Sequence, residues 1–260
     1  MRGSASGPTA GTICVMPDEF RPGSRRQTPT VAIPIAAVGL ATAGAALAVW
    51  ARAGGTADHV SAVALAVTIA LIALTGCVVT LARPGNRVGW LITATACAWG
   101  VGEGLFDTGV RGIVTAPGSV PAASAFAVVG GPLRAAGWLG AAIAVPVLFP
   151  DGRLPGSRWR WLAWTTLAAI AASFVGTALA TDVQNIELRA AGWHNPIALP
   201  GALAGFGDAV STVSLPLMIA TIAGGVAALI SRWRGGTTPI RRQLRELRRQ
   251  VSLPSVFPPN

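Results

Sequence analysis

Six long apolar runs constrain the fold of this chain more than any other feature. Each has 18 to 22 residues, and they cover 31–49, 60–81, 88–106, 132–149, 162–180 and 210–230. At a rise of about 1.5 Å per residue, such a run crosses a hydrocarbon core of roughly 30 Å as a helix. The runs show no alternation of apolar and polar residues, which a membrane barrel would need. The sequence therefore predicts an all-α integral membrane protein with six transmembrane helices.

Composition and charge placement support this class. The 260 residues are 52% hydrophobic and only 12% charged, which is too little charge to cover a soluble globule. The net charge of +10 comes from arginine alone, because the chain has no lysine. A basic balance also occurs in nucleic-acid-binding proteins, but here the arginines lie in the gaps between apolar runs. We expect them to contact the lipid bilayer, and we expect no nucleic-acid partner.

The distribution of arginines predicts the orientation. Sixteen arginines lie in the N-terminal tail, the 83–87 turn, the 151–160 turn and the C-terminal tail, against three in the other gaps: Arg52, Arg111 and Arg189. Cytoplasmic loops carry the excess of positive charge, so both termini are expected in the cytoplasm of a multi-pass cell-membrane protein. Most tryptophans fall near the ends of the apolar runs, where indole rings favour the headgroup layer.

Three regions follow from this pattern. Residues 1–30 are expected to form a disordered cytoplasmic tail, in which Met16 is an alternative translation start to Met1. Residues 31–231 form the six-helix transmembrane domain, and 232–260 a basic cytoplasmic juxtamembrane tail. Within the domain, the basic turn 149–161 is a water-facing hinge. Pro132 is expected in the first turn of the fourth helix, although 122–129 is also apolar and either lies in the interface or extends the span.

No catalytic, metal or cofactor site is predicted. The glycine-rich 100–104 segment follows an apolar run and lacks the Lys-Ser/Thr of a phosphate loop, so it is interpreted as a close helix contact. Three cysteines, Cys14, Cys77 and Cys97, share no metal spacing. His59 and His194 are interpreted as solvated histidines of outside loops. We therefore expect a protein that is not an enzyme.

Glu103 and Arg134 are the ionisable residues within the apolar stretches. Each lies about 22 Å above the cytoplasmic end of its helix, so the two share a level and are candidates for an ion pair. Asp107 and Asp208 lie close to the same outer level, and the four residues together are a candidate ligand-binding cluster. The alternative, which their depth favours, is that each side chain simply extends to the outer headgroups.

The C-terminal segment 237–250 predicts a basic amphipathic helix. Ile240, Leu244, Leu247 and Val251 share one face, and five arginines are candidates for lipid headgroup contact: Arg241, Arg242, Arg245, Arg248 and Arg249. The favoured interpretation is a helix on the anionic inner leaflet. The alternative is a signalling helix that pairs with its copy in a homodimer through a short heptad seam.

Three landmarks resemble a known family. They are Gly85-Asn-Arg-Val-Gly-Trp90, Phe149-Pro-Asp-Gly-Arg-Leu-Pro155, and Arg232-Trp-Arg-Gly followed by Arg241-Arg-Gln-Leu244. In residue identity, order and spacing they resemble the N-terminal membrane region of actinobacterial sensor histidine kinases of two-component systems. The resemblance covers about residues 31–244. That resemblance implies an input domain that feeds a cytoplasmic kinase. The chain departs from the pattern after Leu244, where neither the kinase nor its phosphoacceptor histidine follows, so no kinase residue is carried over.

The sequence thus favours a non-catalytic, sensor-like membrane protein that responds to a stimulus in the membrane or at its outer face. Its expected partners are the lipid bilayer and either a separate kinase chain or a second copy of itself. One alternative is a small transporter or permease component, although the inner halves of the apolar runs offer no polar path. The other is a remnant of a split or truncated sensor kinase gene.

Overall fold

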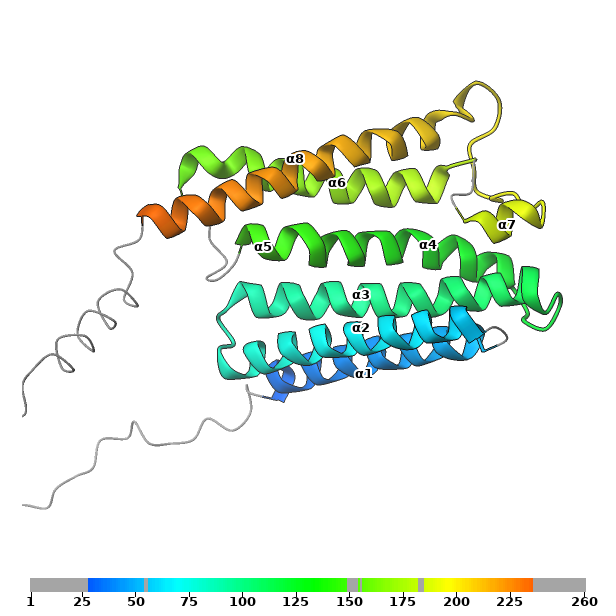
Figure 1. Cartoon of the computed structure of the whole chain (residues 1–260), viewed down its shortest axis with the longest axis horizontal. Coiled ribbons are helices and arrows are strands. Elements are labelled where there is room, and N and C mark those ends of the chain that lie inside the picture. Colours follow the sequence, from blue (N-terminus) through cyan, green and yellow to red (C-terminus); the bar gives the residue numbers. More distant parts are fainter. Residues whose placement is uncertain (1–27, 54–55, 149–153, 155, 182–184, 236–260) are drawn as a thin grey trace, which may run out of the picture.

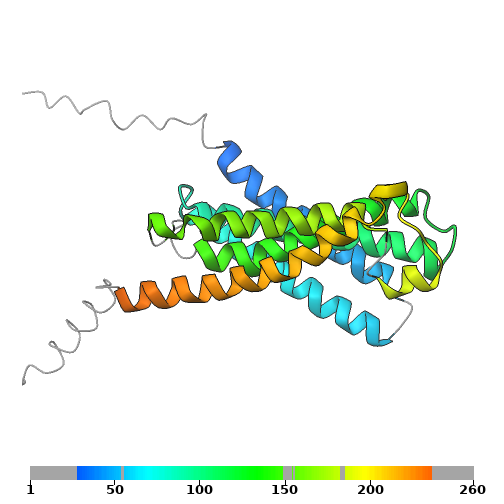
Figure 2. The same cartoon turned by 90° about the horizontal axis from the view of Figure 1, so that it is seen from above.

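The computed structural model describes residues 28–53, 56–148, 154, 156–181 and 185–235, and within these ranges all regular structure is helical. Long helices lie side by side along one direction, joined at alternate ends (Figure 1). They are α1 (Thr28–Ala51), α2 (Thr56–Ala82), α3 (Arg87–Val110), α4 (Ala123–Leu139), α6 (Arg160–Leu179) and α8 (Phe206–Gly235). The start of α1 and the end of α8 lie at the same end of the bundle (Figures 1 and 2).

Shorter segments complete the long helices and their connections. The π-helical η3 (Gly140–Ala144) and α5 (Val145–Leu148) continue α4, and the π-helical η2 (Arg111–Thr115) continues α3. At the same end as η2, α7 (Ile186–Ala190) and η5 (Gly201–Leu203) lie between α6 and α8, while η4 (Ser157–Trp159) precedes α6. Every described connection therefore lies at one of the two ends of the bundle (Figure 1).

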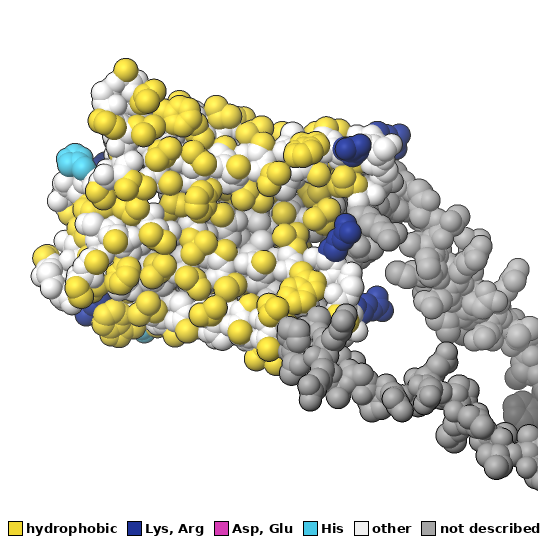
Figure 3. Space-filling view, turned by 180° about the vertical axis from the view of Figure 1, so that it is seen from behind, with side chains coloured by type: hydrophobic (Ala, Val, Ile, Leu, Met, Phe, Trp, Pro, Cys, Tyr) yellow, Lys and Arg dark blue, Asp and Glu magenta, His cyan; other side chains and the backbone are white. Residues whose placement is uncertain are grey.

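Five helical stretches of the described chain are long and apolar enough to cross a membrane: Val31–Ala51, His59–Ala82, Ala123–Leu148, Ser157–Leu179 and Gly201–Ala228. Their outward faces carry exposed leucine, valine and isoleucine side chains, which cover much of the surface in Figure 3. A surface this apolar is typical of a protein that inserts in lipid. α3 is not among the five, because its glycines, threonines and acidic residues reduce its average hydropathy.

α3 lies at the centre of the bundle and packs against α1, α2 and α4. Its contact with α1 is made through small residues: a Cβ on Gly100 would clash with the carbonyl of Ala41, and one on Gly104 would clash with the carbonyl of Gly44. On its other side, a Cβ on Gly102 would clash with the backbone of Arg134. The predicted helix-packing role of the 100–104 segment is therefore confirmed, since these glycines let two neighbouring backbones approach closely.

The remaining helices form a hairpin that packs on α4. α6 packs against both α8 and α4, and a core of Leu139, Ile143 and Ala169 joins α4 and η3 to α6. A second cluster of Val147, Leu162 and Ala228 joins α5, α6 and α8 near the end where the described chain begins and ends. The bundle thus has two parts, the helices α1 to α4 and the α6–α8 hairpin, which meet along α4.

Two local predictions are corrected. The fourth helix starts at Ala123, so Pro132 lies inside it and not in its first turn, and the alternative in which the apolar 122–129 stretch extends the helix is the one observed. The reason is packing, because Gly130 sits against the backbone of Phe106 and the extra turns cover the half of α3 that ends at Val110. His59 also lies in the first turns of α2 and not in a loop.

Several predictions fall on residues outside the described ranges. These are the N-terminal tail with Cys14 and Met16, most of the turn 149–155, and the C-terminal amphipathic segment with Arg241, Arg242, Arg245, Arg248 and Arg249.

Candidate functional site

Two buried carboxylates and two arginines meet at one end of the bundle. The Nε atom of Arg52 lies 2.6 Å from Oδ2 of Asp107, a short ion pair and not an aligned hydrogen bond, while Nη2 donates to Oδ1 at 2.7 Å. The same Nη2 lies 3.5 Å from Oε1 of Glu103, and Nη1 of Arg134 lies 3.5 Å from that oxygen. We call these four residues the ionic cluster. Its positive and negative charges balance.

The fold explains why these side chains meet. Glu103 and Asp107 are one helical turn apart on α3, so they project from the same face, and they are 4% and 3% exposed. Arg52 directly follows the last residue of α1, which α3 contacts through glycines. Arg134 comes from the middle of α4. The cluster therefore ties three helices together, and it keeps two carboxylates, which are costly to bury alone, beside compensating charges.

Both arginines of the cluster are partly exposed, with 31% of the Arg52 side chain and 32% of the Arg134 side chain accessible. Burial acts to lower the pKa of Arg52, but the hydrogen bond and charge of Asp107, together with the charge of Glu103, leave its pKa above the ordinary value. Arg52 therefore stays charged at every physiological pH.

A third arginine secures the same end of the bundle without joining the cluster. Nη1 of Arg111 donates to the carbonyl of Ala51 at 3.2 Å, and its guanidinium lies 4.8 Å from the centre of the Trp50 ring. These contacts join the end of α1 to the π-helical end of α3, and they hold the backbone beside Arg52 in place.

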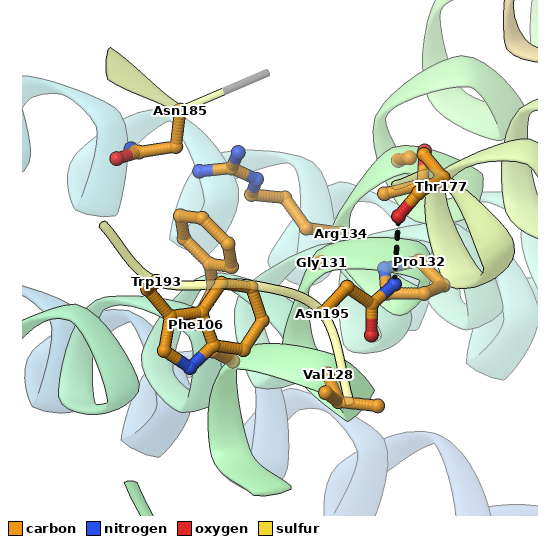
Figure 4. Close-up of a pocket in the computed structure, with 12 residues that line it drawn as sticks. Phe106, Val128, Gly131, Pro132, Arg134, Thr177, Asn185, Trp193 and Asn195 are labelled. Carbon is orange, nitrogen blue, oxygen red and sulfur yellow. Dashed lines mark hydrogen bonds between the residues drawn. The ribbon is translucent and has the colours of Figure 1, made fainter. Parts of the chain in front are cut away.

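Arg134 borders an enclosed cavity of about 120 Å³ beneath the segment between α6 and α8 (Figure 4). Its guanidinium lies 4.1 Å from the centre of the Phe106 ring, an arrangement in which the ring face attracts the cation. Trp193 and Asn195 close the cavity from the segment after α7. An arginine between aromatic and amide side chains can bind a small polar or anionic molecule.

The segment that closes this cavity is held by specific contacts. Nδ2 of Asn195 donates to the carbonyls of Ala178 and Ala180 at 2.8 and 3.0 Å, and Nε1 of Trp193 donates to Oγ of Ser124 at 3.1 Å. Leu188 of α7 is fully buried against Phe106, Val110 and Ala127. The 185–195 segment is thus a packed lid.

Arg134 also borders a second, more open cavity of about 430 Å³. Trp99 and Glu103 of α3, Trp138 of α4, Ser173 of α6, and Ser211 and Ser214 of α8 line it. Ala135 and Thr177 line both cavities, as Arg134 does. Because α8 contributes to its wall, this cavity lies where the two parts of the bundle meet.

The structure brings three of the four predicted site residues together. The ion pair predicted between Glu103 and Arg134 is confirmed, and Asp107 joins it through Arg52. The alternative in which Glu103 extends to the headgroups does not hold, since its side chain is buried. Asp208 is not part of the ionic cluster. It lies in the first turn of α8, where it accepts a hydrogen bond from Thr181 Oγ1 at 2.6 Å, and it lines with Arg189 a third cavity that shares Trp138, Ser173, Ser211 and Ser214 with the larger one.

Sequence reasoning missed Arg52. Its signal was present, because it is one of few arginines in the gaps assigned to the outside and it directly follows an apolar run. The arginine count treats Arg52 only as a charge that orients the chain, although the end of the first apolar run and Asp107 lie at a similar level in the membrane.

Comparison of the chain with protein-family models, with curated proteins and with solved structures gives no match. Across the described ranges, no three His, Cys, Asp or Glu side chains lie together in a way that could hold a metal ion. The function is therefore argued from the ionic cluster and the two cavities.

Proposed function

We propose that the chain crosses the cell membrane six times, with both termini in the cytoplasm and the ionic cluster near the outer face. The even number of long helices supports this, as does the excess of arginines at the end where α1 begins and α8 ends. In this proposal α3 also crosses the membrane, in addition to the five apolar stretches. It can do so because its polar and small residues face neighbouring helices and not lipid. Its burial at the centre offsets its low hydropathy.

Within this arrangement, the protein acts as a sensor-like input domain that binds a ligand near the outer face and does no chemistry of its own. The observation that carries this proposal is the position of Arg134. It lies between two cavities, one beneath the lid and one at the meeting of the two parts of the bundle. Its partner Glu103 links it to Arg52, and through that residue to Asp107 and the end of α1.

A ligand in either cavity contacts both parts of the bundle. Thr177 of α6 lines both cavities, and Ser211 and Ser214 of α8 line the larger one, while Arg134 belongs to α4. Binding therefore shifts the equilibrium between arrangements of the α6–α8 hairpin against α1 to α4, provided that the arrangements differ in affinity. Such a shift moves the end of α8, which leads to the cytoplasmic side in the proposed topology.

The buried threonines support a sensor over a transporter. Oγ1 of Thr80, Thr93 and Thr166 donates to a carbonyl of the same helix at 2.7, 2.9 and 2.7 Å. These hydroxyls are satisfied within their helices, so they do not continue the polar groups of the cavities toward the cytoplasmic side.

The signalling partner follows from the resemblance to the membrane region of sensor histidine kinases. In this proposal, the end of α8 and the basic segment after it pass the movement to a separate kinase chain or to a second copy of the protein. No residue of the described cluster has a part in phosphoryl transfer.

The proposal is tested by distance measurement between the cytoplasmic ends of the helices. Spin labels are placed through Leu81→Cys on α2 and Ile230→Cys on α8, both exposed, in a chain without its native cysteines. Arg134→Gln removes the central charge of the site. We expect it to change the distribution of distances between the labels, because Arg134 borders both cavities that residues of the hairpin line.

Ser119→Gln is the matched control, since Ser119 is exposed in the connection between α3 and α4 at the same end as the cluster. It should leave the distribution unchanged. A distribution that Arg134→Gln leaves unaltered would mean that the outer site is not coupled to the cytoplasmic ends, and it would overturn the sensor proposal.

A further inference from the structure

A further, mainly apolar cavity of about 290 Å³ lies closer than the larger cavity to the cytoplasmic end of the proposed topology. It is lined by Leu71, Ile72 and Thr75 of α2, Ile92 of α3, Ala141 and Val145. The two cavities share faces on three helices. On α3, Ile92 of the apolar cavity is 7 and 11 residues from Trp99 and Glu103 of the polar one, spacings that place all three on one side of a helix.

The same register holds on the neighbouring helices. Leu65 of the polar cavity and Ile72 of the apolar cavity are 7 residues apart on α2. On the other side, Trp138 is followed by Ala141 and Val145 at spacings of 3 and 4 residues. The two cavities therefore lie one after the other along the same side of α3, between α2 and α4, and they are the polar and apolar halves of the groove that we propose below.

The length of this groove fits a long apolar chain such as a prenyl tail. Glu103 and Ile92 are 11 residues apart, which is about 16 Å along the helix axis. With the inner boundary of the hydrocarbon core at Val88, Glu103 lies about 22 Å and Ile92 about 6 Å above that boundary, on either side of a midplane at about 15 Å. A molecule with its head at the ionic cluster and its tail along Ile92 would therefore extend from the outer half of the core across the midplane.

The polar end of the groove determines the kind of head. Arg52 and Arg134 balance Glu103 and Asp107, so a further charge on a ligand would be uncompensated at a buried site. Glu103, the member of the cluster that lines this cavity with Arg134, also lies about 8 Å below the outer boundary of a roughly 30 Å core whose inner boundary is at Val88, deeper than charged lipid headgroups prefer. Both observations favour an uncharged head.

The side chains around the cluster add hydrogen-bond donors and flat aromatic surfaces. The guanidinium of Arg134 donates, and Trp99 and Trp138 reach the same cavity from facing helices. Two indole rings at one cavity favour a planar head that stacks on them, with acceptor oxygens for the guanidinium. We propose that the groove binds a membrane quinone, with its ring between the tryptophans, a ring carbonyl accepting from Arg134 and its prenyl tail along Ile92 and Ala141.

This inference rests on the proposed function only in taking the ionic cluster as the ligand site, and binding alone tests it. The purified full chain in phosphatidylcholine nanodiscs is titrated with menaquinone that carries a short prenyl chain. Saturable quenching of tryptophan fluorescence gives the affinity, and the melting temperature gives an independent measure. We expect saturable quenching and a higher melting temperature, and a much weaker effect from menadione, which has the ring without the tail.

Two matched pairs of variants locate the site. Ala141→Phe fills the tail groove, whereas Ala142→Phe places the same ring on the exposed neighbouring position. Arg134→Gln replaces the charged donor to the ring with a shorter, neutral amide, whereas Arg160→Gln makes the same change at an exposed arginine at the other end of the bundle. Ala141→Phe and Arg134→Gln should each weaken binding by about tenfold or more, as expected for loss of a packed tail or a charge-assisted hydrogen bond, and the controls should bind as the parent does.

Three outcomes would overturn the quinone assignment. Equal binding of menadione and menaquinone would show that the prenyl tail adds no affinity. An equal melting-temperature shift with palmitate or diacylglycerol would show that the site does not recognise the quinone ring. Equal affinities of the Ala141→Phe and Ala142→Phe proteins would place the quinone elsewhere, and this pair remains informative if Arg134→Gln fails to fold. Quinone binding without movement of the spin labels would keep this inference and overturn the sensor role, while movement without binding would do the reverse.

Discussion

Arg52 and Asp107, 55 residues apart in the chain, form the shortest charge contact of the ionic cluster, with Nε 2.6 Å from Oδ2 and Nη2 2.7 Å from Oδ1. The contact joins the end of α1 to the face of α3 that also carries Glu103. It compensates a carboxylate that is 3% exposed, so Asp107 can remain charged inside a largely apolar bundle. The end of the bundle that contains the ionic cluster is therefore held together by ion pairs, while its middle is held together by close glycine contacts between helices.

Asp107→Asn should destabilise the protein strongly, because it leaves Arg52 beside a neutral amide and Glu103 as the one remaining carboxylate for the two arginines of the cluster. Removing one partner of a buried pair costs about 3–5 kcal/mol, and the partial exposure of Arg52 puts the expected loss near the lower end. Asp208→Asn is the matched control, since Asp208 is also acidic but lies outside the cluster. Melting of the detergent-solubilised proteins measures both, and a smaller loss for Asp107→Asn than for Asp208→Asn would contradict the role of the pair.

Glu103 and Arg134 should be energetically coupled. Glu103→Gln, Arg134→Gln and the double variant form a cycle in which we expect a coupling of about 0.5–3 kcal/mol, the range for residues in direct contact. A parallel cycle of Glu103→Gln with Arg111→Gln should be additive within about 0.5 kcal/mol, because Arg111 bonds to Ala51 and stacks on Trp50. Additive losses in both cycles would reduce Glu103 and Arg134 to independent charges.

Gly44 and Gly39 offer a matched test of the contact between α1 and α3. A Cβ on Gly44 would clash with the carbonyl of Gly100, whereas a Cβ on Gly39 has open space. Gly44→Ala should therefore cost about 1–3 kcal/mol through overpacking, while Gly39→Ala should be neutral or stabilising by up to about 1 kcal/mol, as alanine favours a helix. Equal melting temperatures for the two variants would mean that the helices do not approach as closely as described.

Much of the architecture can be predicted from the sequence, because lipid-exposed helices need long apolar runs and those runs are easily counted. The helical class follows from them, and five of the stretches meet the requirements of length and composition. The start of α4 was not predictable in the same way. Gly130, Gly131 and Pro132 favour a helix boundary locally, and only the neighbouring surface of Phe106 and α3 favours continuing the helix through them.

The candidate site was predictable where two residues share a helix level. Equal depths placed Glu103 beside Arg134 without any knowledge of packing, and a similar level added Asp107 and Asp208 as candidates. Depth alone could not separate Asp208 from the cluster, because two residues at one level can lie on opposite sides of a bundle. Arg52 was not predicted as a site residue. A long arginine side chain at the end of a helix can reach several neighbouring residues, and only the packing of α1 on α3 determines which of them it contacts.

The central proposal is that the chain crosses the membrane six times with the ionic cluster near the outer face. The accessibility of introduced cysteines tests this topology most directly. Ser157 and Ser119 are exposed and lie in connections at opposite ends of the bundle. With Cys14, Cys77 and Cys97 replaced, a membrane-impermeant thiol reagent applied to intact cells should label Ser119→Cys and leave Ser157→Cys unlabelled until the membrane is opened. Labelling of Ser157→Cys from outside, with Ser119→Cys protected, would reverse the topology and place the cluster at the cytoplasmic face.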